Sequence, residues 1–216
     1  MSEESVFQQL TSYGVAPVIA IESVEAALPL ADILLECGLP VAEITFRTAA
    51  AADVIRTLAQ QRPQLLVGAG TVLTVENVRA AKDCGARFGV APGLNPAVLA
   101  MARDLGLPFI PGVATPSEVE HGLALGCRVL KFFPAGALGG PAMLKALAGP
   151  YLHTGVRFVP TGGVNAGNML EYLALPYVAV VGGTWLATKD DLKQGKWDAI
   201  RERCSAAVAA ARQRQR

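Results

Sequence analysis

The feature that most constrains the fold is a repeated pair of signals, a glycine that closes a helical stretch and an apolar run that starts a few residues later. The pair recurs at Gly38, Gly85, Gly106 and Gly126. Glycine readily adopts the left-handed backbone conformation that ends a helix. Because a strand follows a helix each time, the repeat predicts βα units on a parallel sheet.

Apolar runs predict the positions of eight strands, with helices between them. Eight strands alternating with helices predict an α/β fold, a single (β/α)8 TIM barrel domain over residues 1–216. An open doubly wound sheet is the alternative, but no G-x-G-x-x-G motif follows the first predicted strand. The predicted strands are residues 16–21, 41–46, 65–69, 88–91, 109–113, 129–133, 157–159 and 178–181.

Several predicted helices begin at a residue whose side chain can cap a helix. The predicted caps are Ser23, Thr74, Asn95 and Thr115, and proline follows Asn95 and Thr115 at the first helical position. An amphipathic segment over residues 2–13 is expected to plug one end of the barrel. The helices predicted after these caps are residues 24–35, 75–82, 97–104 and 117–125. The last helix is predicted over residues 193–212, and residues 213–216 are expected to be a frayed tail.

Composition narrows the classes of partner. The formal net charge is +1 and no basic stripe occurs, so we expect no nucleic acid partner. No apolar run approaches the roughly 20 residues of a membrane span, and the acidic start lacks the pattern of a signal peptide. The four cysteines form no C-x-x-C pair and there are two histidines, so we expect no metal site and a reducing, cytoplasmic setting.

One lysine stands inside an apolar run, in Val129-Leu130-Lys131-Phe132-Phe133. None of the other five lysines stands in a predicted strand. A buried ammonium is costly unless it is paired or loses its proton. Desolvation can lower a lysine pKa and leave a nucleophilic amine, which can form a Schiff base with a ketone. The alternative is a strand-end lysine whose stem packs while its charged head reaches water.

The second predicted strand ends in Glu43-Ile44-Thr45-Phe46-Arg47. With the period of two of a strand, Glu43, Thr45 and Arg47 share one face, which we expect to point into the barrel. A carboxylate and a guanidinium placed there indicate an acid/base group beside a carboxylate-binding arginine. An internal ion pair that only closes the barrel is the alternative.

Glycines mark the ends of the third, seventh and eighth predicted strands. Gly68-Ala69-Gly70-Thr71 allows a ligand to approach the backbone and offers a hydroxyl. The later turns, Thr161-Gly162-Gly163 and Gly182-Gly183-Thr184, predict a phosphate site in which bare N–H groups at helix N-termini bind the anion. The alternative is that these are only tight turns.

Taken together, these motifs resemble the family of 2-keto-3-deoxy-6-phosphogluconate (KDPG) and 4-hydroxy-2-oxoglutarate (KHG) aldolases. The similarity extends from about Ala16 to Trp185. The matching motifs are Glu43-Ile44-Thr45-Phe46-Arg47, Gly68-Ala69-Gly70-Thr71, Ala91-Pro92-Gly93, Pro111-Gly112-Val113-Ala114-Thr115-Pro116, Lys131-Phe132-Phe133-Pro134, Pro160-Thr161-Gly162-Gly163 and Gly182-Gly183-Thr184-Trp185.

The resemblance implies a class I aldolase without cofactor or metal, a homotrimer that cleaves a phosphorylated keto sugar acid to pyruvate and an aldehyde. Lys131 corresponds to the Schiff-base lysine and Glu43 to the carboxylate that moves protons through water. Arg47 and Thr71 correspond to groups that hold the pyruvate carboxylate. The remaining correspondences are Pro92 and Phe133 as apolar walls, and Thr161, Gly162, Gly163, Gly182, Gly183 and Thr184 as the phosphate site.

Two residues depart from the family pattern. Several relatives have Ser where Thr184 stands, and relatives often have Glu where Gly136 stands.

Three other functions remain open. They are an aldolase for the galactonate-derived epimer, a phosphosugar isomerase or epimerase, and a non-catalytic sugar-phosphate-binding barrel. The isomerase would need a second acid or base at a strand end, and neither histidine stands at one.

Overall fold

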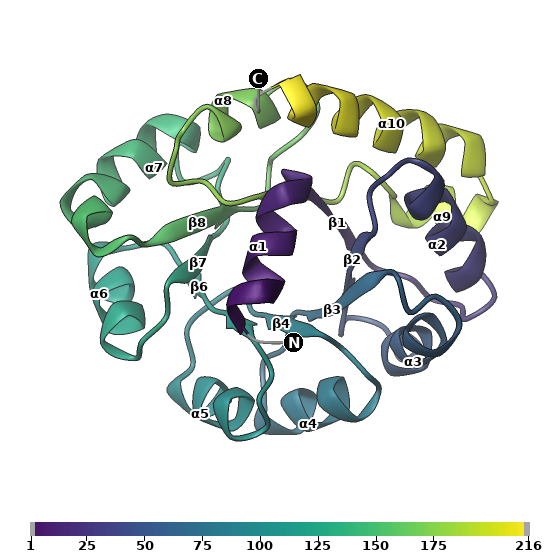
Figure 1. Ribbon diagram of the computed structural model, residues 1–216, viewed down its shortest axis with the longest axis horizontal. Helices are drawn as coiled ribbons and strands as arrows, with labels where there is room; N and C mark the ends of the chain where they lie inside the picture. Colours follow the sequence, from purple (N-terminus) through teal and green to yellow (C-terminus); the bar gives the residue numbers. More distant parts are fainter. Residues whose placement is uncertain (1–2, 214–216) are drawn as a thin grey trace.

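A computed structural model describes residues 3–213, in which parallel strands curve around a centre and helices cover their outer side (Figure 1). Figure 1 looks onto the end where α1 (Glu3–Tyr13) crosses the opening. Val6 and Leu10 of α1 are buried there, which agrees with the predicted plug. Because α1 leads directly into the first strand, this is the amino end of the strands, and their carboxyl ends lie on the opposite side.

The strands form two parallel sheets, with the order β5-β4-β3-β2-β1-β9 in one and β6-β7-β8 in the other. Nearly every strand residue is buried, as expected for parallel strands covered by helices. The bounds are β1 (Val15–Ile19), β2 (Val41–Thr45), β3 (Leu66–Gly70), β4 (Phe88–Val90), β5 (Phe109–Ile110), β6 (Gly112–Val113), β7 (Val129–Phe132), β8 (Arg157–Pro160) and β9 (Val181–Gly183).

The helices alternate with the strands, as the repeat predicts. They are α2 (Ala27–Glu36), α3 (Ala51–Gln61), α4 (Val75–Asp83), α5 (Pro96–Asp104), α6 (Pro116–Ala124), α7 (Gly140–Ala148), the 3-10 helix η1 (Gly149–Thr154), α8 (Met169–Leu173), α9 (Lys189–Gln194) and α10 (Trp197–Gln213).

Two predicted strands differ from the structure. The strand expected over 109–113 is divided into β5 and β6 at Pro111, whose ring nitrogen has no hydrogen to donate to a neighbouring strand. The strand expected over 178–181 starts only at Val181, and Val178 makes an isolated bridge to Phe158. A second isolated bridge joins Thr161 to Gly182. Each of the eight predicted strand positions therefore overlaps a strand of one of the two sheets.

The helix ends follow the sequence signals closely. The four repeat glycines, Gly38, Gly85, Gly106 and Gly126, all have φ between 59° and 94°, so the predicted left-handed closures are confirmed. Three predicted caps are confirmed as well, because the side chains of Thr74, Asn95 and Thr115 each accept a hydrogen bond from a backbone N–H in the first turn.

Two predicted helices differ in part from the structure. The helix expected over 24–35 begins only at Ala27, after a turn in which the Ala27 N–H donates a hydrogen bond to the Val24 carbonyl and the Ser23 hydroxyl accepts one from the N–H of Ala26. The last helix, expected over 193–212, is two helices separated at Gly195, whose φ of 64° interrupts the helical path. In the predicted frayed tail, residues 214–216 lie outside the described residues, as does Ser2 of the predicted plug.

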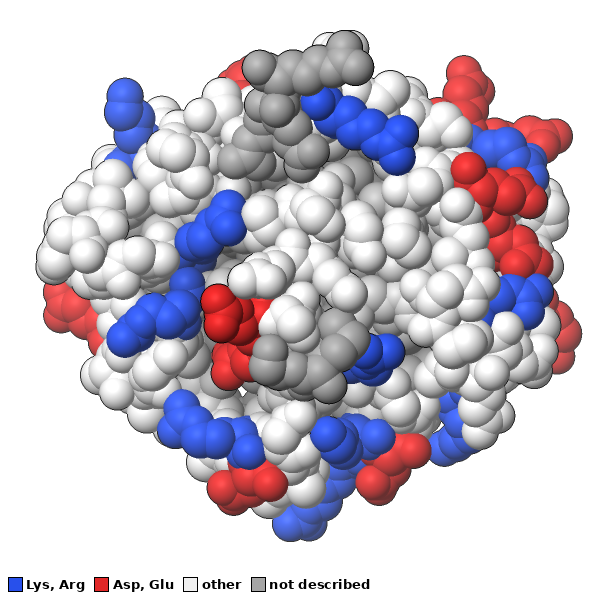
Figure 2. All heavy atoms as spheres, in the orientation of Figure 1, with Lys and Arg blue, Asp and Glu red and all other residues white. Residues whose placement is uncertain are grey.

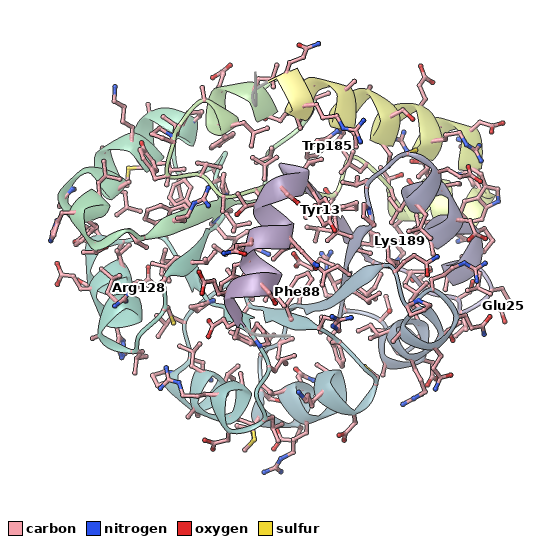
Figure 3. All side chains as sticks on the ribbon, in the orientation of Figure 1. Tyr13, Glu25, Phe88, Arg128, Trp185 and Lys189 are labelled. Atoms are coloured by element: carbon pink, nitrogen blue, oxygen red, sulfur yellow. The ribbon has the colours of Figure 1, made fainter. Side chains whose placement is uncertain are left out.

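Two aromatic side chains stand over glycines of the strand that precedes their own, one on each face of the sheet. A Cβ on Gly68 would lie 2.2 Å from the Phe88 ring, and one on Gly89 would lie 2.6 Å from the Phe109 ring. Phe88 lies near the centre of the curved sheets in Figure 3. These glycines are therefore required for packing.

Charged side chains are mixed on the face that α1 covers. Figure 2 shows basic and acidic side chains intermingled on this face, between larger uncharged areas. Among the described residues, no helix combines the length and the apolar composition required to cross a bilayer.

Candidate active site

Lys131 and Glu43 meet on the inner side of the curved sheets, although β7 and β2 are not neighbours in either sheet. The Lys131 Nζ and Glu43 Oε1 atoms are 3.4 Å apart, and each residue is only 5% exposed. Two charges can be withdrawn from water when each compensates the other. The pair therefore places one amine and one carboxylate within reach of the same small molecule, shielded from bulk solvent.

The Glu43 carboxylate fits because β3 has no side chain beside it. A Cβ on Gly70 would lie 2.3 Å from Glu43 Oε1. Gly70 pairs with Thr45 in the register of β2 and β3, so the gap lies directly beside the end of β2. The sequence predicted these glycines as an approach for a ligand, and the structure shows that Gly70 also makes room for the buried acid.

Phe133 links the lysine to the glycine turn that follows β8. The Lys131 Nζ lies 5.5 Å from the centroid of the Phe133 ring, which is within the range of a cation–π contact. A Cβ on Gly162 would lie 3.0 Å from the same ring. Lys131, Phe133 and the Gly162 turn therefore border one space, as the alternation along β7 predicts for the first two.

Arg47 lies at the rim of this space rather than in its interior. It is exposed, whereas Thr45 is buried, so the prediction that all three polar residues point inward is confirmed for Glu43 and Thr45 only. The Arg47 Nε donates a hydrogen bond to the Thr45 Oγ1 over 3.1 Å. The ionic partner of Glu43 is Lys131, so the alternative of a closing Glu43–Arg47 ion pair is wrong.

Thr71 and Pro92 stand just past the carboxyl ends of β3 and β4, at the same end of the strands as Arg47. Thr71 has a φ of 57° and is the one described non-glycine residue with positive φ. A β-branched residue rarely adopts this conformation, and such strain concentrates at functional sites. Pro92 is half-buried, and its carbonyl lies so close to Gly112 that a Cβ there would approach it to 2.0 Å.

The two glycine turns lie side by side. The Thr161–Gly182 bridge joins them, and a Cβ on Gly182 would lie 2.4 Å from the Thr161 Oγ1. Gly162 and Gly163 have φ values of 86° and 83°, which only glycine adopts readily. The structure therefore brings Thr161, Gly162, Gly163, Gly182, Gly183 and Thr184 together at one end of β8 and β9.

The expected helix N-termini at these turns are a wrong prediction. The helix α8 begins only at Met169 and α9 only at Lys189, so both start well past their glycines. The N–H groups available to an anion are those of the turns themselves, which can form a concave nest. Gly183 also has a packing role that the sequence did not indicate, because its missing Cβ is where the Trp185 indole lies.

A buried acid that the sequence analysis missed holds the segment after the second glycine turn. Asp191 accepts hydrogen bonds from the Thr188 hydroxyl and from the Arg203 guanidinium. The Thr188 hydrogen bond, followed by the one from Arg203, keeps the pKa of the Asp191 carboxyl below its usual value. The signal in the sequence was weak, since Thr188 three residues before Asp191 resembles an ordinary helix cap.

Within residues 3–213, no three His, Cys, Asp or Glu side chains lie close enough together to hold a metal ion. The fold and the buried amine–carboxylate pair thus define an α/β protein equipped for nucleophilic attack of a lysine on a carbonyl carbon. Residues 6–203 match the family described as KDPG and KHG aldolase, and the chain belongs to that family.

Three relatives illustrate the similarity. A 2-dehydro-3-deoxy-phosphogluconate aldolase of Haemophilus influenzae is 46% identical over 91% of this chain and 92% of its own length. The KHG/KDPG aldolase of Escherichia coli K12 is 42% identical over 98% and 97%. The solved structure of the Legionella pneumophila KDPG aldolase, with pyruvate captured as a covalent carbinolamine, is 42% identical with a TM-score of 0.89 and covers 96% and 98% of the two chains.

Proposed function

We propose that the chain is a class I aldolase that reversibly cleaves 2-keto-3-deoxy-6-phosphogluconate to pyruvate and glyceraldehyde 3-phosphate, and 4-hydroxy-2-oxoglutarate to pyruvate and glyoxylate. Membership in the family and the names of the relatives support this substrate class. The observation that carries the proposal is the 3.4 Å approach of the buried Lys131 Nζ to the Glu43 carboxylate. A lysine placed in this way has a general acid/base within one water of its reaction centre.

In the proposed mechanism, Lys131 passes a proton to the Glu43 carboxylate, and the free amine then attacks the C2 ketone of the substrate. The carbinolamine loses water and becomes a protonated imine, which is the electron sink for the next step. Removal of the C4 hydroxyl proton breaks the C3–C4 bond and releases the aldehyde, while the electron pair passes to the imine and gives an enamine. Protonation at C3 and addition of water then release pyruvate and the free amine.

Glu43 is the proposed carrier of these protons, since its carboxylate is the acid/base group next to the Nζ. Arg47 and Thr71 at the rim are the proposed groups for the substrate carboxylate, because a guanidinium fork matches a carboxylate. Pro92 and Phe133 are the proposed apolar walls. The proposed phosphate site is the pair of turns, Thr161, Gly162, Gly163, Gly182, Gly183 and Thr184, whose bare N–H groups suit an anion.

A retro-aldol assay coupled to pyruvate detection tests the proposal. The wild-type chain should release pyruvate from the phosphorylated substrate. Lys131→Ala should lower kcat by on the order of a thousandfold or more, as loss of a covalent nucleophile does, whereas Lys145→Ala on the exposed side of α7 should not. Release of pyruvate by Lys131→Ala at the wild-type rate would refute the proposal. Comparing kcat/KM on the gluconate- and galactonate-derived epimers decides between the two aldolases.

We also infer that the two sheets close into one (β/α)8 barrel domain over the whole chain. The Phe158–Val178 and Thr161–Gly182 bridges support closure on one side, and the short break at Pro111 supports it on the other.

A homotrimer is proposed from the family resemblance, and light scattering should give a mass three times 22.5 kDa. All four cysteines are free, which suits a cytoplasmic location.

A further inference from the structure

We propose that Thr45 is a positioning residue for the reaction, which holds Arg47 in the orientation that receives the substrate carboxylate. The inference rests on the proposed function and extends it to a residue without contact to the reacting atoms. Thr45 is 1% exposed at the end of β2. A free hydroxyl at this depth needs hydrogen-bond partners, and the partners that it has determine what it does to Arg47.

The Thr45 hydroxyl makes two hydrogen bonds, and its role as donor or acceptor is fixed in each of them. Its single proton is donated to the Ile19 carbonyl at the end of β1 over 3.0 Å. Its oxygen is then left only as an acceptor, and it accepts the Nε–H of Arg47 over 3.1 Å. Because a hydroxyl has one proton and two lone pairs, this arrangement selects a donor at the position of Arg47 and holds the guanidinium by its inner edge.

The outer edge of the guanidinium is thereby left for a ligand. Within the described part of the chain, the two Nη groups of Arg47 have no hydrogen-bond partner. A guanidinium has five donors in a rigid planar fork. With Nε engaged by Thr45, the two Nη groups form the free end of that fork. We expect the substrate carboxylate to bind this end with two parallel hydrogen bonds.

A second threonine provides a matched control. The Thr48 hydroxyl donates a hydrogen bond to the Ile21 carbonyl over 2.6 Å, so it ties the same loop to the same neighbouring segment. Within residues 3–213, no hydrogen bond joins the Thr48 hydroxyl to the Arg47 guanidinium. Loss of the Thr48 hydroxyl therefore removes a loop anchor of the same kind, and loss of the Thr45 hydroxyl removes an anchor together with the hold on Arg47.

The experiment measures the pyruvate concentration that half-saturates borohydride trapping on Lys131, which requires neither an aldehyde nor a phosphate. Thr45→Val should raise this concentration about tenfold, equivalent to about 1.4 kcal/mol, and leave the saturating extent of trapping close to wild type. For Thr45→Ser and Thr48→Val, the half-saturating pyruvate concentration should stay within about twofold of the wild-type value. Because Thr45 acts through Arg47, adding Thr45→Val to Arg47→Ala should change the half-saturating pyruvate concentration by less than about twofold.

Equal effects of Thr45→Val and Thr48→Val would overturn the inference, and so would a further tenfold loss from Thr45→Val in the Arg47→Ala background. If Thr45→Val does not fold, as judged by circular dichroism, Thr45→Ala replaces it in the comparison with Thr45→Ser. Failure of the wild-type chain to be trapped at all would overturn the proposed function. Normal wild-type trapping with an unaffected Thr45 variant would overturn the positioning role alone.

Discussion

Gly136 and Gly163 lie back to back. A Cβ on Gly163 would lie 3.0 Å from the Gly136 Cα, and a Cβ on Gly136 would lie 3.1 Å from the Gly163 Cα. The N–H of Gly136 also donates a hydrogen bond to the Gly162 carbonyl over 2.7 Å. The loop after the lysine strand and the glycine turn after β8 are therefore held together, and a side chain at position 136 must displace the turn slightly.

This contact predicts the cost of a methyl group at Gly163. Gly163→Ala should destabilise the fold by more than the ~1–2 kcal/mol that a left-handed conformation costs an ordinary residue, because the new Cβ also meets Gly136. Gly155→Ala is the matched control, since Gly155 has a similar φ of 77° and no atom within 4 Å of its Cβ position. Urea unfolding curves of the two variants check the difference, and equal losses would show that the contact has no effect on stability.

The buried ion pair predicts a second stability effect. Lys131→Met leaves the Glu43 carboxylate buried without its partner, and breaking one side of a buried pair costs about 3–5 kcal/mol. Adding Glu43→Gln to this variant should recover part of the loss, because a neutral amide is less costly to bury. Lys145→Met, at an exposed lysine, should change stability by less than about 0.5 kcal/mol. A Lys131→Met variant as stable as wild type would contradict this prediction.

The hydrogen bonds from Thr188 and Arg203 predict how stability depends on pH. They lower the pKa of Asp191 in the folded state, so they stabilise the fold above the unfolded pKa of about 3.9, and this stabilisation is lost as the pH falls through that value toward the folded pKa. Asp191→Asn should therefore lose Tm less steeply than wild type on acidification below about pH 5. Tm measured against pH checks this, with Asp190→Asn on the exposed side of α9 as the control. Parallel curves for wild type and Asp191→Asn would contradict it.

Much of the fold could be predicted because its signals are local. The left-handed closures at the repeat glycines and the caps at Thr74 and Thr115 depend on a few neighbouring residues. The splits at Pro111 and Gly195 were missed, although proline and glycine mark both. Apolar residues continue across Pro111 and helix-forming residues flank Gly195, and periodicity alone does not show where hydrogen bonding is interrupted.

The sequence predicted which residues belong to the candidate site better than it predicted the contacts between them. The alternation along two strands placed Lys131 and Glu43 inside, and the structure brings them together. The partner of Arg47 was not predictable, because whether a side chain at a strand end turns to Thr45 or into the interior depends on three-dimensional packing. The roles of Gly70 and Gly183 in making room for Glu43 and Trp185 were hidden for the same reason.

The most direct test of the central claim is to locate the lysine that carries the substrate. The chain is incubated with pyruvate, reduced with borohydride, digested and examined by mass spectrometry under conditions in which it releases pyruvate from the phosphorylated substrate. The account predicts a reduced pyruvate adduct on the peptide that contains Lys131, and no adduct in Lys131→Met. An unmodified Lys131 peptide in the active wild-type protein would contradict it.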